Sequence, residues 1–108
     1  MKAAAVLVAA AQCFAGADQS LRAGERNEAI RTRLEACLPG IENAMACYEE
    51  TLWATAFFAS KRGGVALERA QRGYPAVFAT LIDEVYRSEK EEDAFRRDWF
   101  IKCIGNHG

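Results

Sequence analysis

The stretch IENAMACYEETLWATAFFAS, residues 41–60, decides the fold of this chain. At 100° per residue its apolar side chains form one main stripe, which contains Ile41, Met45, Tyr48, Leu52 and Ala59. Its second half, residues 51–59, carries no charge, and the aromatic side chains there point in several directions. A helix that is apolar all round is normally buried. We therefore expect either the central helix of a bundle or a helix with a second working face.

The flanking sequence predicts further helices separated by glycine and proline. The expected helices span residues 20–37, 65–72, 76–88 and 90–104. The two prolines, Pro39 and Pro75, both fall at breaks between these segments. Since no alternating strand pattern of useful length appears, the sequence predicts an all-α protein, a compact antiparallel bundle of four to five helices.

The N-terminal residues MKAAAVLVAAAQCFAGA, 1–17, have the pattern of a secretory signal. Lys2 supplies a positive start, residues 3–15 are uncharged and mostly apolar, and Ala15-Gly16-Ala17 is a small-x-small cleavage site. This predicts a signal peptide over 1–17 and a single helical domain over 18–108, located in the periplasm or secreted. The alternative is an alanine-rich first helix of a cytoplasmic protein, because alanine is the best helix former.

The balance of charge and hydropathy excludes several classes of partner. The 108 residues carry 14 basic and 15 acidic side chains, for a net charge of −1. A chain without a basic excess is not expected to bind nucleic acid. No stretch reaches the roughly 18 uncharged residues of a membrane-spanning helix. We therefore expect neither a nucleic-acid partner nor a membrane span.

The four cysteines are Cys13, Cys37, Cys47 and Cys103. Cleavage after residue 17 would leave three, hence one disulfide and one free or intermolecular thiol. Cys37 and Cys103 both lie on apolar stripes, so we favour the pair Cys37–Cys103, with Cys47–Cys103 second. An unpaired Cys47 would permit a disulfide-linked homodimer. The alternative is that all three are small buried side chains without crosslinks.

The sequence offers no recognisable catalytic, cofactor-binding or metal-binding motif. Neither C-x-x-C nor H-E-x-x-H occurs, and the only histidine, His107, is next to the last residue. A nucleophile normally needs an oriented base, most often histidine. We therefore expect a protein that is not an enzyme and has no metal or cofactor.

Surface contacts remain as the source of function. Trp53 and Phe57 are one helical turn apart and are the first candidates for contact with a partner, because aromatic residues dominate interface hot spots. The basic side chains Arg62, Arg69 and Arg72 follow in sequence and would suit an acidic partner. The competing interpretation places Trp53 in the core, where it could meet Trp99, and leaves the arginines as a solvated surface.

Taken together, these features predict a small exported helical protein that binds a protein partner, as an inhibitor or an immunity protein against a toxin or enzyme does. The second hypothesis is a carrier of a small apolar ligand. Its cavity would be lined by Tyr48, Leu52, Phe78, Leu81 and Trp99. The third is a cytoplasmic helical protein without a signal peptide.

Overall fold

The computed structural model describes the backbone of residues 2–107 and the side chains of residues 8–106. In chain order its elements are α1 (Lys2–Arg22), α2 (Asn27–Cys37), α3 (Ala44–Arg62), α4 (Leu67–Arg72), the 3-10 helix η1 (Ala76–Phe78), α5 (Ala79–Arg87) and α6 (Glu92–His107). No strand occurs over these residues, so the all-α prediction is confirmed.

The helix expected over residues 20–37 is wrong in its first part. Residues 20–22 belong to the end of α1, and the chain turns at Gly24 before α2 begins at Asn27. Gly24 has φ +79°, a left-handed conformation that glycine adopts without steric strain. The other expected helices are present, with their ends shifted by a few residues.

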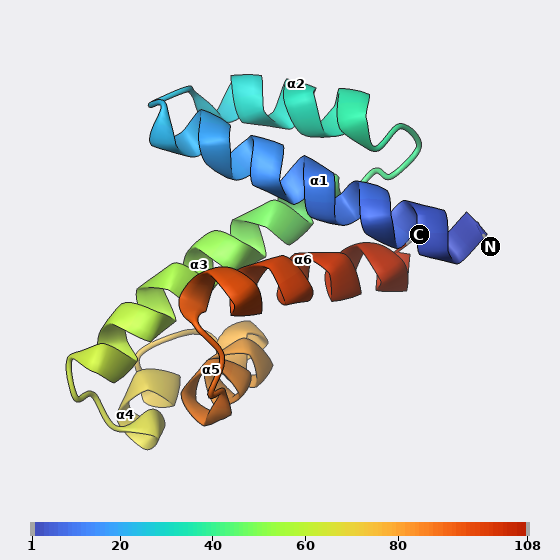
Figure 1. The fold of residues 1–108 in the computed structure, drawn as a ribbon. Coiled ribbons are helices and arrows are strands. Elements are labelled where there is room, and N and C mark those ends of the chain that lie inside the picture. The colour runs from blue at the N-terminus through green and yellow to red at the C-terminus, as the bar shows by residue number, and fades with distance from the viewer. Residues whose placement is uncertain (1, 108) are drawn as a thin grey trace.

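The helices are arranged in layers around α3 and α6 (Figure 1). The helical hairpin of α1 and α2 lies across one side of this central pair, and α4, η1 and α5 lie on the other side. Helix α3 packs against α2, α4, α5 and α6. The segment 41–60 therefore does form the central helix of the fold.

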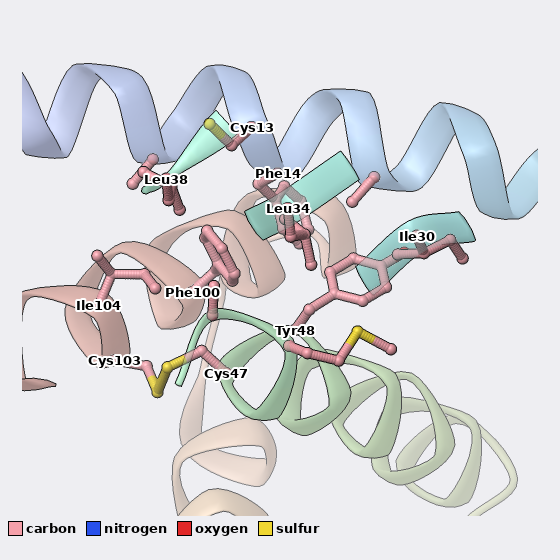
Figure 2. Close-up of a cluster of buried hydrophobic side chains, with 14 residues drawn as sticks. Cys13, Phe14, Ile30, Leu34, Leu38, Cys47, Tyr48, Phe100, Cys103 and Ile104 are labelled. Carbon is pink, nitrogen blue, oxygen red and sulfur yellow. A yellow bond between two sulfur atoms is a disulfide. The ribbon is translucent and has the colours of Figure 1, made fainter. Parts of the chain in front are cut away.

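One hydrophobic cluster joins α1, α2, the first half of α3 and the second half of α6, which we call the crosslinked half (Figure 2). Phe14 from α1 contacts the rings of Tyr48 and Phe100, with centroids 5.9 and 5.5 Å apart. Ile30 and Leu34 supply the buried face of α2. Several of the remaining members are small side chains, among them alanines and cysteines.

A second cluster joins the second half of α3 to α4, α5 and the first half of α6, and we call it the aromatic half. Phe57, Phe58 and Phe95 are its large buried side chains. Phe58 meets Phe95 edge-on, with ring centroids 5.3 Å apart. No cysteine belongs to this cluster.

Both disulfides of the chain lie in the crosslinked half, which takes its name from them. Cys13–Cys37 joins α1 to α2 and Cys47–Cys103 joins α3 to α6, with Cα atoms 5.9 and 5.7 Å apart. Both separations are ordinary for a disulfide. The pairing that we favoured, Cys37–Cys103, is wrong, and the second choice, Cys47–Cys103, is present. The hairpin of α1 and α2 directs Cys37 toward α1, whereas Cys103 lies opposite Cys47. Because Cys47 is bonded within the chain, it cannot link a dimer.

Helix α1 continues without a break through the expected cleavage site after Ala17. Ala10, Cys13, Phe14 and Ala17 are all buried in the core. The signal peptide over 1–17 stays a prediction, but cleavage there and the Cys13–Cys37 disulfide exclude one another in the same mature molecule.

None of the described helices is both long and apolar enough to cross a membrane.

Candidate functional site

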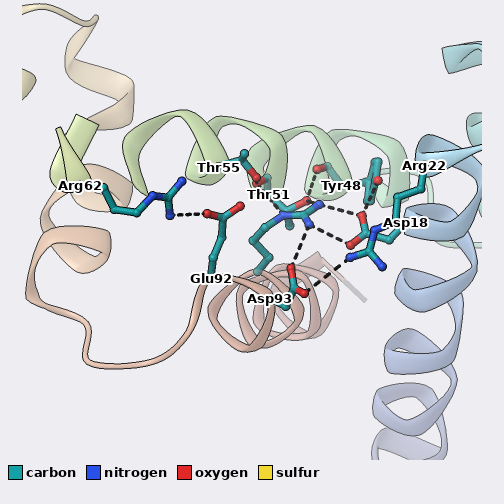
Figure 3. A network of polar contacts seen from close by, with 9 residues as sticks. Asp18, Arg22, Tyr48, Thr51, Thr55, Arg62, Glu92 and Asp93 are labelled. Atoms are coloured by element: carbon teal, nitrogen blue, oxygen red, sulfur yellow. Dashed lines mark hydrogen bonds and ion pairs between the residues drawn. The ribbon is translucent and has the colours of Figure 1, made fainter. Parts of the chain in front are cut away.

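A buried polar network holds α1, α3 and α6 together (Figure 3). The Arg96 guanidinium donates from Nη1 to Asp18 Oδ2 and from Nη2 to Asp18 Oδ1, both at 2.8 Å. The Tyr48 hydroxyl donates to Asp18 Oδ1 at 2.7 Å, and Arg96 Nε donates to the Thr51 carbonyl at 3.1 Å. The side chains of Asp18 and Arg96 are only 9% and 6% exposed. A buried ion pair is tolerated only when its hydrogen bonds are satisfied in this way.

Tyr48 and Arg96 both have a raised pKa in this network. Burial, followed by the hydrogen bond to Asp18, raises the pKa of Tyr48 well above its usual range. Burial alone would lower the pKa of Arg96, but the hydrogen bonds and charge of Asp18 raise it above its ordinary value. Asp18 and Arg96 therefore neutralise one another in the interior, and the network positions helices without offering a reactive group to solvent.

The sequence reasoning missed this network entirely. Asp18 and Arg96 are 78 residues apart in the sequence. The predicted signal peptide places Asp18 at the first position of a mature chain, outside any helix. A local signal is the helical spacing, because Asp18 follows Phe14 by four residues and Arg96 precedes Phe100 by four, so each charge lies on an apolar stripe.

An exposed aromatic surface lies on the aromatic half, formed by Trp53, Tyr74, Val77 and Phe78, and we call it the Trp53 surface. Trp53 is 41% exposed and Val77 is 82% exposed. The Trp53 ring lies 4.7 Å from that of Phe78 and 6.0 Å from that of Tyr74, centroid to centroid. The rings of Trp53 from α3, Tyr74 from the loop before η1 and Phe78 from η1 thus pack together, and Val77 is the exposed sequence neighbour of Phe78 in η1.

Of the two aromatic residues predicted to contact a partner, Trp53 and Phe57, only Trp53 faces solvent. Phe57 is fully buried, with its ring 4.9 Å from that of Tyr74, so it supports the surface from beneath and cannot touch a partner directly. Trp53 is exposed in part, so its assignment to the core was also wrong. Trp99 stacks on Phe95 at 5.9 Å, and among the described residues its ring has no contact with Trp53.

The three predicted arginines have different surroundings. Arg62 is paired with Glu92 at 2.8 Å, which neutralises its charge. Arg69 and Arg72 lie exposed on α4, and over the described residues neither makes an ion pair. Lys61, the neighbour of Arg62, donates to the carbonyls of Val85 and Ser88 at the end of α5. Of the three arginines, Arg69 and Arg72 on α4 are therefore the two without an ion pair among the described residues, and the Lys61 ammonium is held by neutral carbonyl groups.

A second polar cluster surrounds the Cys47–Cys103 disulfide. Trp99 Nε1 donates to Glu50 Oε1 at 3.0 Å, and Glu50 Oε2 lies 3.5 Å from Cys103 Sγ. A shallow pocket of about 240 Å³ opens beside these groups. Its lining consists of Glu50, Thr80, Glu84, Trp99, Lys102, Cys103 and Asn106.

The side chains that were expected to line a carrier cavity are divided between the two halves. Tyr48 belongs to the crosslinked half and Leu52 packs against it. Phe78, Leu81 and Trp99 belong to the aromatic half or pack against it. Since Tyr48 and Leu81 are almost fully buried in separate clusters, this arrangement does not favour the carrier hypothesis.

Comparison of the chain with protein-family models, with curated proteins and with solved structures finds no match. Its function is therefore inferred from the residues described above. Of these, the Trp53 surface is directed at solvent, whereas the Asp18–Arg96 network is closed to it.

Proposed function

We propose that this chain is an extracytoplasmic binding protein, periplasmic or secreted, that contacts a protein partner through the Trp53 surface. Inhibitors and immunity proteins act in this way, by covering a functional area of their partner. The observation that supports this most directly is the partial exposure of Trp53 against the rings of Tyr74 and Phe78, next in sequence to the 82% exposed Val77. Tryptophan and tyrosine are enriched among the residues that dominate binding energy.

The crosslinked fold favours this kind of binding. The helix that carries Trp53, α3, is bonded to α6 through Cys47–Cys103, and Phe57 fixes the aromatic rings from below. A surface that is already ordered loses less conformational entropy when it binds. The exposed charges of Arg69 and Arg72 would add attraction to an acidic partner and accelerate its association.

The proposed compartment rests on the cysteines. All four are in disulfides in the structure. Disulfides form and persist in oxidising compartments and are rare in the cytosol. This supports a location outside the cytoplasm and is less compatible with the cytoplasmic alternative.

The proposal is tested by affinity purification of the tagged protein from the extracytoplasmic fraction of its host. We expect the same protein to be recovered with the wild type and lost with Trp53→Ala or Val77→Asp. Leu21→Ala is the matched control, because Leu21 is 38% exposed, lies on α1 in the crosslinked half and follows the predicted cleavage site. Equal recovery by all three variants would contradict the proposal.

Sedimentation of the purified chain provides a separate control. A stable homodimer that Val77→Asp dissociates would mean that a second copy occupies the Trp53 surface. In that case the partner would be a second copy of this chain and not a different protein. A monomer at the concentration of the pull-down is the result that our proposal requires.

A further inference from the structure

The fold brings three metal-ligand side chains together where the sequence separates them. Cys47 and Glu50 are three residues apart on α3, so they lie on the same face of that helix. Cys103 lies opposite them on α6, with its Cα 5.7 Å from that of Cys47. The two sulfur atoms and a carboxylate oxygen of Glu50 all lie within 4.8 Å of one another.

These donors match the preferences of one class of ion. Thiolate and carboxylate together are ligands of Zn²⁺, which accepts sulfur and oxygen in a tetrahedral set. In the oxidised protein the two sulfur atoms are bonded to each other and cannot bind a metal ion as thiolates. A dithiol or phosphine reductant supplies two electrons, two protons are taken up, and two thiols replace the S–S bond. A metal ion then displaces both thiol protons as it binds.

We propose that the reduced protein binds one Zn²⁺ through Cys47 Sγ, Cys103 Sγ and the Glu50 carboxylate. The disulfide and the metal ion are then alternative crosslinks between α3 and α6. Either one holds the same two helices together. This proposal does not depend on the proposed function of the Trp53 surface.

The surroundings of the three donors fit such a site. The Trp99 indole donates to Glu50 Oε1 at 3.0 Å and leaves Oε2 directed at the sulfur of Cys103. Outer hydrogen bonds of this kind orient metal ligands. The pocket beside Glu50 and Cys103 gives an ion a route from solvent and room for water as a fourth ligand.

The other cysteine pair provides an internal control. Cys13 and Cys37 are also on neighbouring helices and have nearly the same Cα separation, 5.9 Å. Over the described residues, however, no carboxylate lies close enough to complete a three-ligand group with them. The proposal therefore predicts that two chemically identical pairs differ in metal binding.

The test uses Co²⁺ as a spectroscopic substitute for Zn²⁺ on the phosphine-reduced full chain. Thiolate bound to Co²⁺ gives a near-ultraviolet charge-transfer band. We expect this band at one Co²⁺ per chain, with displacement by Zn²⁺ and no band before reduction. The variant C13S/C37S should retain the band and C47S/C103S should lose it. Absence of the band in reduced wild-type protein, or equal bands in the two double variants, would overturn the proposal.

Two single variants keep the test decisive if either double variant fails to fold, because they retain all four cysteines. Glu50→Gln should weaken Co²⁺ binding by about tenfold or more through loss of a charged ligand. Glu49→Gln is the matched control, since Glu49 is the exposed neighbour of Glu50 and should bind Co²⁺ as the wild type does. Identical affinity of the wild type and Glu50→Gln would exclude Glu50 as a ligand.

Discussion

The crosslinked half and the aromatic half share α3 and α6 but are stabilised by different means. The first contains both disulfides and the buried Asp18–Arg96 pair. The second contains neither and is held by aromatic rings, such as Phe58 on Phe95 and Phe57 on Tyr74. A chain of this size hides only about 60–65% of its unfolded surface, so a thin core benefits from crosslinks. The crosslinked half therefore combines covalent bonds with large buried side chains such as Tyr48 and Phe100, whereas the aromatic half depends on side-chain packing alone.

Among the residues with described side chains, the exposed large apolar residues are arranged differently in the two halves. In the aromatic half, Trp53 is exposed against the rings of Tyr74 and Phe78, and Val77 next to Phe78 in sequence is exposed as well. In the crosslinked half, Val8 and Leu21 are exposed and lie 13 residues apart on α1. Contiguous exposed apolar area is the kind that marks interaction sites. Our proposal places partner binding in the aromatic half, whereas both disulfides and the buried ion pair lie in the crosslinked half.

The largest effect is expected from removal of residues 1–17. This deletion removes Phe14 from the core, a loss of about 3–5 kcal/mol, and also the Cys13–Cys37 disulfide, worth about 3 kcal/mol. We therefore expect the native protein to keep α1 at least from Cys13 onward. Mass spectrometry of the native chain without reduction measures this. A chain that begins at Asp18 with a free Cys37 thiol would contradict the expectation and support the signal peptide.

Arg96→Ala should destabilise the protein by about 3–5 kcal/mol, because it leaves the buried Asp18 carboxylate without its charge partner. The double variant Asp18→Leu, Arg96→Met should recover much of that loss by removing both buried charges. Urea unfolding monitored by circular dichroism compares the two. A loss below about 1 kcal/mol for Arg96→Ala would show that the pair does not link α1 to α6.

The two disulfides should differ modestly in their contribution to stability. The chain-entropy model gives about 4 kcal/mol for Cys47–Cys103, whose cysteines are 56 residues apart, and about 3 kcal/mol for Cys13–Cys37, which are 24 apart. The variants C47S/C103S and C13S/C37S test this by denaturant midpoints. A larger loss of stability in C13S/C37S than in C47S/C103S would mean that the crosslink between α1 and α2 stabilises the fold more than the crosslink between α3 and α6.

Alkaline pH should weaken the crosslinked half in particular. Since the pKa of Tyr48 is raised above its ordinary value of 10.0, the folded protein keeps the phenol proton where the unfolded chain loses it. This contribution is complete below about pH 10 and declines as the pH rises further. The difference in the free energy of unfolding between the wild type and Tyr48→Phe should therefore become smaller between pH 9 and about 11.5. A constant difference over that range would contradict the assigned cause.

The smallest effect on stability is expected at the Trp53 surface. Val77→Asp changes a side chain that is 82% exposed, so its effect on the free energy of unfolding should stay within about 0.5 kcal/mol. The same variant is expected to abolish partner recovery. Thermal unfolding and the pull-down, measured on one preparation, separate these two quantities. A loss of several kcal/mol would mean that Val77 is part of the core and not of a binding surface.

Several elements of the fold were predictable because they depend on local pattern. The apolar stripe of residues 41–60 indicated α3, Pro39 indicated the break before it, and Pro75 indicated the break between α4 and η1. The position of Trp53 off the main stripe left two alternatives, a surface residue or a core residue, and the structure places it at the surface, 41% exposed. The burial of Phe57 was not predictable, because the same helix position faces solvent or core according to where Tyr74 and Phe78 are placed.

The sequence by itself determined the all-α class and the absence of long apolar segments, and it offered the central position of α3 as one of two alternatives. Those properties follow from periodicity and composition, which act over one or two helical turns. Only the tertiary structure decided the disulfide pairs, the Asp18–Arg96 network and the meeting of Cys47, Glu50 and Cys103. Each depends on which faces of distant helices come into contact. Side-chain spacing within one helix fixes the direction of its own residues and leaves their partners across the core undetermined.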